Sequence, residues 1–441
     1  MKVTIIGAGL AGCEAAFQLA QRNIEVDLYE MRPHTKTGAH KTDMPAEFVC
    51  SNSLGAKEPS NASGLLKTEM EILNCQLLKI AKEVQTPAGN ALAIDRTLFS
   101  QKVKELIENN KNINYIQKEI DEIPQDTPII IASGPLTSDK LAQKIQEFTG
   151  ENHLHFFDAI APIVEKDSIN FDIAWYQNRY DKGEACYINC PMNKEQYEKF
   201  YKFLTSAEKI ELKTFEKEHN AKFFESCLPI EVIASRGVDT LRFGPMKPIG
   251  LVDARTNEKN YAVVQLRQDD IAKSLYNLVG FQTNLKWGEQ KKLLQLIPGL
   301  ENVNITKYGV MHRNTFINSP NILNPTLQTR KNKNVFFAGQ ITGTEGYTES
   351  IADGLIAGIN MAKFIQGENL LTFPTETMIG ALLNYITSSE HKTFQPINSN
   401  WGILAPIELD KKTRKNKKLK CEILANRAIS TMKEFIKENN I

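Results

Sequence analysis

The sequence has no apolar run of the roughly 20 residues needed to cross a membrane. It also lacks the basic segment, apolar run and cleavage site of a secretory signal. Its seven cysteines are odd in number and irregularly spaced, unlike a disulfide framework. The close pair Cys186 and Cys190 has no second pair or histidine cluster at zinc-ligand spacing, so we predict no metal site. These absences predict a cytoplasmic protein with reduced thiols and no membrane partner.

Net charge is also nearly absent. The 53 lysines and arginines are balanced by 52 aspartates and glutamates, which gives a formal charge of +1. Composition alone therefore does not indicate nucleic-acid binding, although a local basic patch is compatible with it. The longest basic run lies at 411–420. Two interpretations stay open for it, a solvated helix face or a set of phosphate contacts.

The first thirty residues contain a motif for binding a dinucleotide. Residues 2–6 and 24–30 are predicted strands, and 13–22 is a predicted helix. Between them, residues 7–12 match G-x-G-x-x-G, whose glycines permit a tight turn, a close approach of pyrophosphate and helix–strand packing. The start of the helix offers N–H groups to the phosphates, and Glu30 offers a carboxylate to the ribose. The assigned residues are Gly7, Ala8, Gly9, Leu10, Ala11, Gly12 and Glu30.

A second glycine-rich turn after the strand at 334–338 suits a ligand that spans two chain segments. This favours FAD over NAD, and it makes Gly339, Gln340 and Ile341 candidate cofactor contacts. We predict an α/β fold, in which a Rossmann-type FAD-binding domain carries an inserted second α/β domain. The predicted parts are 1–149 and 326–441 for the FAD-binding domain and 150–325 mainly for the insertion. Predicted helices lie at 64–84, 97–109, 194–206 and 349–365, and a predicted buried strand lies at 128–134.

Three segments are similar to one family. They are Ala-Glu-Phe-Val-Cys-Ser-Asn-Ser-Leu at 46–54, the stretch from Cys-Leu-Pro-Ile-Glu-Val to Gly-Pro-Met-Lys-Pro at 227–248, and Met-His-Arg-Asn-Thr-Phe-Ile-Asn-Ser-Pro at 311–320 followed by 337–343. Over nearly its whole length the chain resembles the folate- and FAD-dependent RNA uracil-5-methyltransferases known as TrmFO. The related GidA-type enzymes share the FAD fold and are longer.

The resemblance implies a reaction and its partners. The one-carbon unit of 5,10-methylenetetrahydrofolate would pass through reduced FAD to C5 of a uridine, where it is reduced to a methyl group. NADPH or NADH would regenerate the reduced flavin. The RNA substrate would be the T-loop uridine of tRNA or, as a variant target, a uridine of 23S ribosomal RNA.

Uracil chemistry asks for a nucleophile that adds at C6 and a base that removes the C5 proton. By resemblance Cys227 is the nucleophile and Cys50 is the proton acceptor. Resemblance also places His312 near the flavin, where it would stack on a pterin or donate a hydrogen bond; a structural histidine is the alternative.

Arg236, Arg242 and Lys247 follow Cys227 in the sequence and are candidate ligands of RNA phosphates. Salt bridges within the inserted domain are the alternative for these cations.

One position departs from the family pattern. The family continues Cys-Ser-Asn-Ser-Leu-Arg, whereas this chain has Gly55 after Leu54. Loss of one charge-assisted contact costs about 1.5–3 kcal/mol, which keeps 23S ribosomal RNA open as the target. Two other functions compete with RNA methylation: a flavin oxidoreductase acting on small molecules, and a non-catalytic RNA-binding protein that retains FAD.

Overall fold

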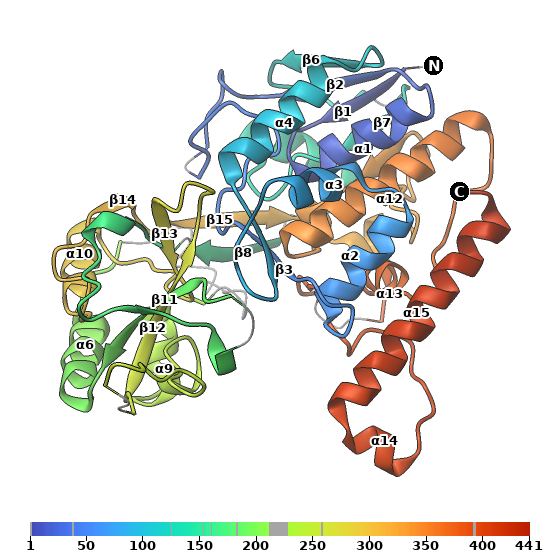
Figure 1. Cartoon of the computed structure of the whole chain (residues 1–441). Helices are drawn as coiled ribbons and strands as arrows, with labels where there is room; N and C mark the ends of the chain where they lie inside the picture. The colour runs from blue at the N-terminus through green and yellow to red at the C-terminus, as the bar shows by residue number, and fades with distance from the viewer. Residues whose placement is uncertain are drawn as a thin grey trace.

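The computed structural model describes residues 2–37, 39–124, 126–152, 154–159, 161–181, 184–210, 228–256, 259–390 and 394–441. Its upper part in Figure 1 is built on a five-stranded parallel sheet. The strand order is β16 (Val335–Phe337), β7 (Ile129–Ile131), β1 (Val3–Ile6), β2 (Val26–Glu30) and β6 (Ile113–Gln117). The three strands β16, β7 and β1 are almost wholly buried, as expected for parallel strands covered on both faces.

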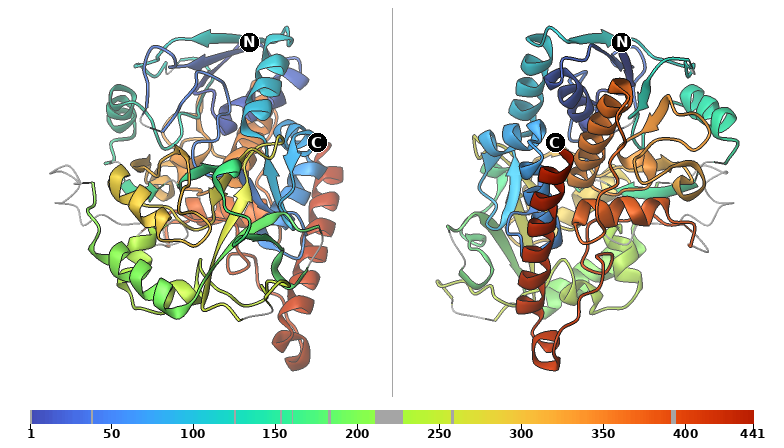
Figure 2. Two further views of the ribbon diagram at one scale, coloured as in Figure 1. Left: turned by 60° about the vertical axis from the view of Figure 1, so that its left-hand side comes forward. Right: turned by 90° about the vertical axis from the view of Figure 1, so that its right-hand side faces the viewer.

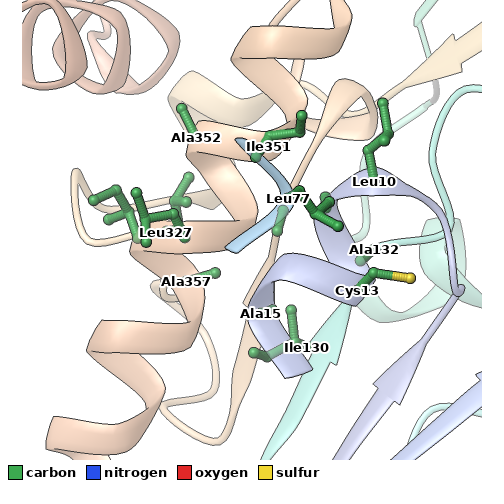
Figure 3. Packing of buried hydrophobic residues seen from close by; sticks show 14 of the residues in the cluster. Leu10, Cys13, Ala15, Leu77, Ile130, Ala132, Leu327, Ile351, Ala352 and Ala357 are labelled. Carbon is green, nitrogen blue, oxygen red and sulfur yellow. The ribbon is translucent and has the colours of Figure 1, made fainter. Parts of the chain in front are cut away.

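Helices α1 (Leu10–Gln21) and α12 (Tyr347–Gln366) pack on each other beside this sheet, although they are distant in sequence. Figure 3 shows Ala15 of α1, Ile130 of β7 and Ala357 of α12 in one apolar cluster. The chain therefore returns after residue 330 to complete the sheet, as predicted. The other helices of this part are α2 (Ala62–Ile72), α3 (Gln76–Glu83), α4 (Arg96–Glu108), α5 (Asp139–Thr149), α11 (Ser319–Ile322), α13 (Met378–Thr387), α14 (Lys411–Lys415) and α15 (Lys417–Asn439).

The prediction of one helix over 64–84 is wrong. Helix α2 ends at Ile72, and Asn74 takes a left-handed conformation with φ of 64°. A new helix, α3, then starts after Cys75, and the buried carboxylate of Glu14 accepts hydrogen bonds from the amides of Gln76 and Leu77. The apolar spacing of four and three continues across the break, so periodicity alone could not locate it.

The lower left part of Figure 1 contains a six-stranded antiparallel sheet with its own core. Its helix α6 (Lys194–Ser206) confirms the helix predicted over 194–206. Its strands pair in antiparallel fashion, unlike the parallel strands of the first sheet. The strand order is β10 (Trp175–Tyr176), β11 (Tyr187–Met192), β12 (Ala262–Gln268), β13 (Leu275–Leu278), β9 (Ile163–Glu165) and β14 (Ile305–Lys307). The further helices here are α8 (Ile230–Ser235), α9 (Thr240–Phe243) and α10 (Trp287–Gln295).

Two short sheets lie between these parts. Strands β8 (Leu154–Ala159) and β15 (Met311–Phe316) form an antiparallel pair. Strands β3 (Ser53–Ala56), β5 (Ala91–Ile94) and β4 (Gln85–Thr86) form the other sheet. The domain boundaries at 149/150 and 325/326 stay predictions. None of the helices in the described ranges combines the length and the apolar character that a bilayer span requires.

Candidate active site

Two adjoining cavities, of about 540 and 580 Å³, lie along the carboxyl ends of the parallel strands. This is where an open parallel sheet places its ligand. The first cavity is lined by residues that include Gly7, Gly9 and Glu30, and the second by residues that include Gly9, Leu10, Ala11, Gly339 and Gln340. Both are lined by Gly9, His40, Ser133 and Leu136, so together they form one elongated site.

The glycine turn fits the pyrophosphate of a dinucleotide. A Cβ built on Gly9 would meet no protein atom within 4 Å, so the backbone there is open to the cavities. Ala8 in the turn and Gly12 in the first turn of α1 are buried and do not line the cavities. A ligand can therefore reach the backbone at Gly9 and the first turn of α1, as FAD phosphates require.

Glu30 is held in place before any ligand arrives. Its carboxylate accepts two hydrogen bonds from the Arg32 guanidinium, at 2.8 and 3.0 Å, and one from the Ala8 amide at 3.3 Å. Burial by itself would raise the pKa of Glu30, but the hydrogen bonds and charge of Arg32 outweigh it and hold the pKa below its usual range. Glu30 is therefore an anionic acceptor, as ribose hydroxyls require.

The second glycine turn rests on a buried carboxylate. Asp353 of α12 accepts hydrogen bonds from the hydroxyls of Thr342 and Thr344, at 2.9 and 2.7 Å. Burial raises the pKa of Asp353 to about 7, against these two hydrogen bonds. Ile341 lies within this turn, but its side chain is fully buried in the core and does not line either cavity.

Cys50 lies beside the end of the second cavity. Its neighbour Val49 and the aromatic ring of Tyr347 both line that cavity. The Cys50 amide donates a hydrogen bond of 2.6 Å to the Tyr347 hydroxyl, and the Tyr347 ring packs on Phe48 with centroids 4.4 Å apart. Tyr347, the first residue of α12, therefore fixes the backbone of the loop around Cys50, which we call the cysteine loop. The Cys50 side chain is half-buried.

A lysine from the other sheet reaches this loop. The ammonium of Lys307, at the end of β14, donates a 3.0 Å hydrogen bond to the carbonyl of Val49. Burial and, after it, the charge of Arg96 lower the pKa of Lys307 to about 8, whereas Cys50 is among the groups that raise it. The ammonium and the Cys50 sulfur therefore interact favourably when the sulfur is a thiolate.

A second cation also acts on Cys50. Burial lowers the pKa of Arg267 in β12, and Cys50 is again among the groups that oppose the shift. The buried Nε of Arg267 has no hydrogen-bond partner among the described residues. Lys307 and Arg267 together favour the thiolate form of Cys50, which is the form that can accept a proton.

Replacing Lys307 by methionine is expected to raise the pH of half-maximal Cys50 alkylation by about one unit, because one opposing charge is removed. Iodoacetamide labelling across pH, followed by peptide mass spectrometry, measures it. Lys307→Arg is the control and should keep the profile of the unsubstituted protein. An unchanged profile in Lys307→Met would show that the ammonium does not act on the sulfur.

The chain was compared with known proteins. Residues 2–369 match the family described as Glucose inhibited division protein A. A relative from Bacillus velezensis named methylenetetrahydrofolate–tRNA-(uracil-5-)-methyltransferase TrmFO is 56% identical over 437 residues, which cover 99% of this chain and 98% of the relative. A relative of the same name from Halalkalibacterium halodurans is 54% identical over 437 residues, with 99% of each chain covered. This chain belongs to the TrmFO family.

Among solved structures, GidA of Aquifex aeolicus superposes with a TM-score of 0.69 at 17% identity. The match covers 98% of this chain and 73% of GidA. At this identity the likeness shows the fold alone, and it confirms the predicted Rossmann-type FAD-binding fold. The resemblance to TrmFO enzymes is confirmed by the relatives themselves.

Two predicted site residues, Cys227 and His312, fall wholly or in part outside the described residues. Cys227 lies outside the described residues, which resume at Leu228 just before α8. His312 belongs to β15, where its backbone pairs with that of Asp158. Its side chain is not among the parts that the structure describes. Their roles, including contact of His312 with a cofactor or substrate, stay predictions.

The three cations that follow Cys227 differ in their surroundings. Arg242 donates to Asp239 at 2.6 Å and to the Tyr261 carbonyl at 3.0 Å, and its guanidinium lies 3.5 Å from the centre of the Tyr261 ring. Its internal partners favour the alternative reading, a salt bridge within the inserted part. Arg236 is exposed and Lys247 is half-buried, and phosphate contact by these two residues stays a prediction.

Gly55 has a different role from the one that its sequence suggested. Its φ of 79° lies in the left-handed region, and a Cβ there would be 2.6 Å from the Ser63 hydroxyl and 3.9 Å from the Lys67 ammonium. The Cβ of a larger residue at this position would therefore point toward a buried lysine. Lys67 donates to the carbonyls of Leu54 and Ser63, at 2.7 and 2.8 Å, so a cation is present behind this loop. Gly55 gives no structural reason to move the target away from tRNA.

Gly55→Ala is expected to lower the free energy of unfolding by about 1–3 kcal/mol, because alanine must adopt a left-handed backbone against Ser63. Urea unfolding of the FAD-free protein measures the change. Gly288→Ala in α10 is the matched control: its added Cβ meets open space, and it should stabilise by about 0.5–1 kcal/mol. Equal stability of the Gly55→Ala and unsubstituted proteins would contradict the strain argument.

Sequence reasoning missed several residues that shape the site. Tyr347 directly follows the second glycine turn, and Arg32 follows Glu30 by two residues, so both had a positional signal. His40 lines both cavities, and burial lowers its pKa to about 4, which makes it neutral at pH 7. His40 and Lys307 had no signal in the sequence, because only the fold brings them to Cys50 and the cofactor.

Proposed function

We propose that this chain methylates C5 of a uridine in tRNA, with 5,10-methylenetetrahydrofolate as the carbon donor and FAD as carrier and reductant. NADPH or NADH serves as the source of electrons, and the substrates place the enzyme in the cytoplasm. The observation that carries the proposal is the position of Cys50 beside the second cavity, on a loop that Tyr347 and Lys307 hold at its backbone, with Lys307 and Arg267 as the cations that act on its charge. The names of the relatives support tRNA as the substrate.

Residues of both glycine turns have proposed roles in binding the cofactor. Gly7, Gly9 and the start of α1 would hold the FAD phosphates, and Glu30 would hold the ribose. Gly339 and Gln340 line the second cavity and would contact the rest of the cofactor. When bound, the flavin carries the one-carbon unit and supplies the hydride that completes the methyl group.

The uridine is activated by the two cysteines. The Cys227 thiolate adds to C6, which makes C5 nucleophilic. After C5 has received the carbon unit, the Cys50 thiolate would take the C5 proton as the bond between that unit and its carrier breaks, which leaves an exocyclic methylene on C5. A hydride added to this methylene would make the methyl group, and departure of Cys227 from C6 would restore the C5–C6 double bond. Lys307 and Arg267 keep Cys50 in the form that accepts this proton.

Reconstitution tests the proposal. The purified protein is given FAD, 5,10-methylenetetrahydrofolate, NADPH or NADH, and an unmodified tRNA transcript, and 5-methyluridine is measured by mass spectrometry. We expect folate-dependent 5-methyluridine in tRNA and none when Cys227 is replaced by alanine with FAD retained. A matched reaction on 23S ribosomal RNA distinguishes the variant target. Flavin turnover by NADPH or NADH without any RNA product would leave only an oxidoreductase.

A further inference from the structure

A groove of about 1280 Å³ lies on the other side of Tyr347 from the flavin cavity. Its walls come from the cysteine-loop strand β3, the starts of α2, α12 and α15, and the loop at 398–401. Tyr347 lines both spaces and holds the Cys50 amide, so the groove and the flavin cavity meet at a residue that positions Cys50.

The groove wall is rich in hydroxyl and amide side chains and has two aromatic residues, Tyr347 and Trp401. The hydroxyl and amide side chains besides Tyr347 are Ser53, Ser60, Asn61, Ser63, Thr348, Asn398, Ser399 and Asn400. The two carboxylates at this wall are already bound within the protein: Ser399 donates to Glu349 through both amide and hydroxyl, and Gln340 donates to Glu345. Hydroxyls, amides and an indole ring suit ribose hydroxyls and bases better than an apolar ligand.

Basic side chains are concentrated on α14 and the start of α15, next to one wall of the groove. Helix α14 and the start of α15 project from the body of the molecule at the lower right of Figure 1, and both views of Figure 2 show the same projection. The exposed lysines there are Lys412, Lys415, Lys417, Lys418 and Lys420. Among described residues, only Lys418 of these five forms an ion pair, with Glu422 at 3.8 Å. Four exposed ammonium groups therefore have no counter-charge of their own.

The spacing of two lysines relates this patch to the groove. Lys417 lines the groove, and Lys420 lies three residues further along α15, on the same helical face. A polyanion that follows this face would enter the groove beside β3 and approach Tyr347. A free anion of small size would need only one of these lysines, whereas a nucleic-acid strand can contact several in succession.

We infer that this groove and the lysines of α14 and α15 hold the backbone of the RNA strand that flanks the target uridine. The inference rests on the proposed function and adds the surface that the RNA occupies. The lysines neutralise phosphates, and the groove takes sugars and unstacked bases on the path to Cys50. Contacts of this kind position the RNA and carry little sequence information.

Two charge-matched double variants on one helix test the surface. Lys417→Gln with Lys420→Gln removes two cations at the groove, and Lys433→Gln with Lys437→Gln removes two exposed cations at the far end of α15. With an unmodified tRNA transcript as probe, we expect the first pair to raise Kd about ten-fold and to lower the slope of log K against log salt by about two. The far pair should match the unsubstituted protein in both respects.

Enzyme kinetics separate the possible occupants. At saturating tRNA the groove pair should keep its kcat, its KM for 5,10-methylenetetrahydrofolate and its FAD content, with only the KM for tRNA raised. A second pair on α14, Lys412→Gln with Lys415→Gln, should repeat the result. Equal Kd and salt slope for the groove and far pairs would overturn the inference, as would a raised KM for the folate instead of tRNA. If the unsubstituted protein neither binds nor methylates tRNA, the proposed function itself fails.

Discussion

Replacing Cys50 by alanine is expected to lower the rate of uridine methylation by about 10²–10⁴-fold while FAD stays bound, because general base catalysis contributes on this order. The cysteine loop is fixed at its backbone by Tyr347, so the substitution removes the thiol without releasing the loop. Single-turnover assays with saturating tRNA measure the rate, and the flavin absorbance reports cofactor content. Cys75→Ala, a buried cysteine at the start of α3 away from both cavities, serves as the control and should retain the rate.

The division of work between the cysteines gives this prediction a second measurement. If Cys227 adds to C6 and Cys50 removes the C5 proton, Cys50→Ala should accumulate a covalent protein–tRNA complex and fail to release tritium from uridine labelled at C5. Cys227→Ala should form no such complex. A covalent complex in Cys227→Ala and none in Cys50→Ala would reverse the two roles.

The sequence predicted the elements of the fold and site that are determined by residues close together in the chain. The strand, glycine turn and helix at 2–22 have local signals, and the structure places Gly7, Gly9 and Glu30 along one cavity. The return of the chain at 334–338 was also readable, because a buried parallel strand is a continuous apolar run. The antiparallel order of the second sheet had no such signal, since it pairs strands that are far apart in the sequence, such as β11 and β12.

The rest depends on contacts between distant segments. Lys307 meets Val49 across the junction of two sheets, and no periodicity relates the two positions. For Gly55 the sequence showed the departure from the family pattern but not its structural consequence. That consequence depends on the backbone angle φ at Gly55 and on the nearby Lys67. Sequence comparison treats a missing arginine as lost charge, whereas the structure shows a position where a side chain would be strained.

The junction of the two sheets carries the largest expected effect on stability. Arg96 at the start of α4 and Asp269 after β12 form an ion pair of 2.6 Å, with side chains only 13% and 8% exposed. Asp269 also accepts from Asn277 at 3.1 Å, and Asn277 donates to Asn52, two residues after Cys50. The pair therefore ties the cysteine loop to the sheet that supplies Lys307 and Arg267.

Asp269→Ala is expected to lower the free energy of unfolding by about 3–5 kcal/mol, because Arg96 would keep a buried charge without its partner. Urea unfolding measures the change. The matched control is Glu83→Ala, which breaks the Lys102–Glu83 pair, also 2.6 Å long but with side chains 43% and 58% exposed. That change should cost less than about 1 kcal/mol.

The double variant Arg96→Met with Asp269→Leu removes both charges and should recover most of the loss, since an apolar pair leaves no buried ion without a partner. Equal losses for the buried and exposed pairs would show that this junction does not depend on the buried charges.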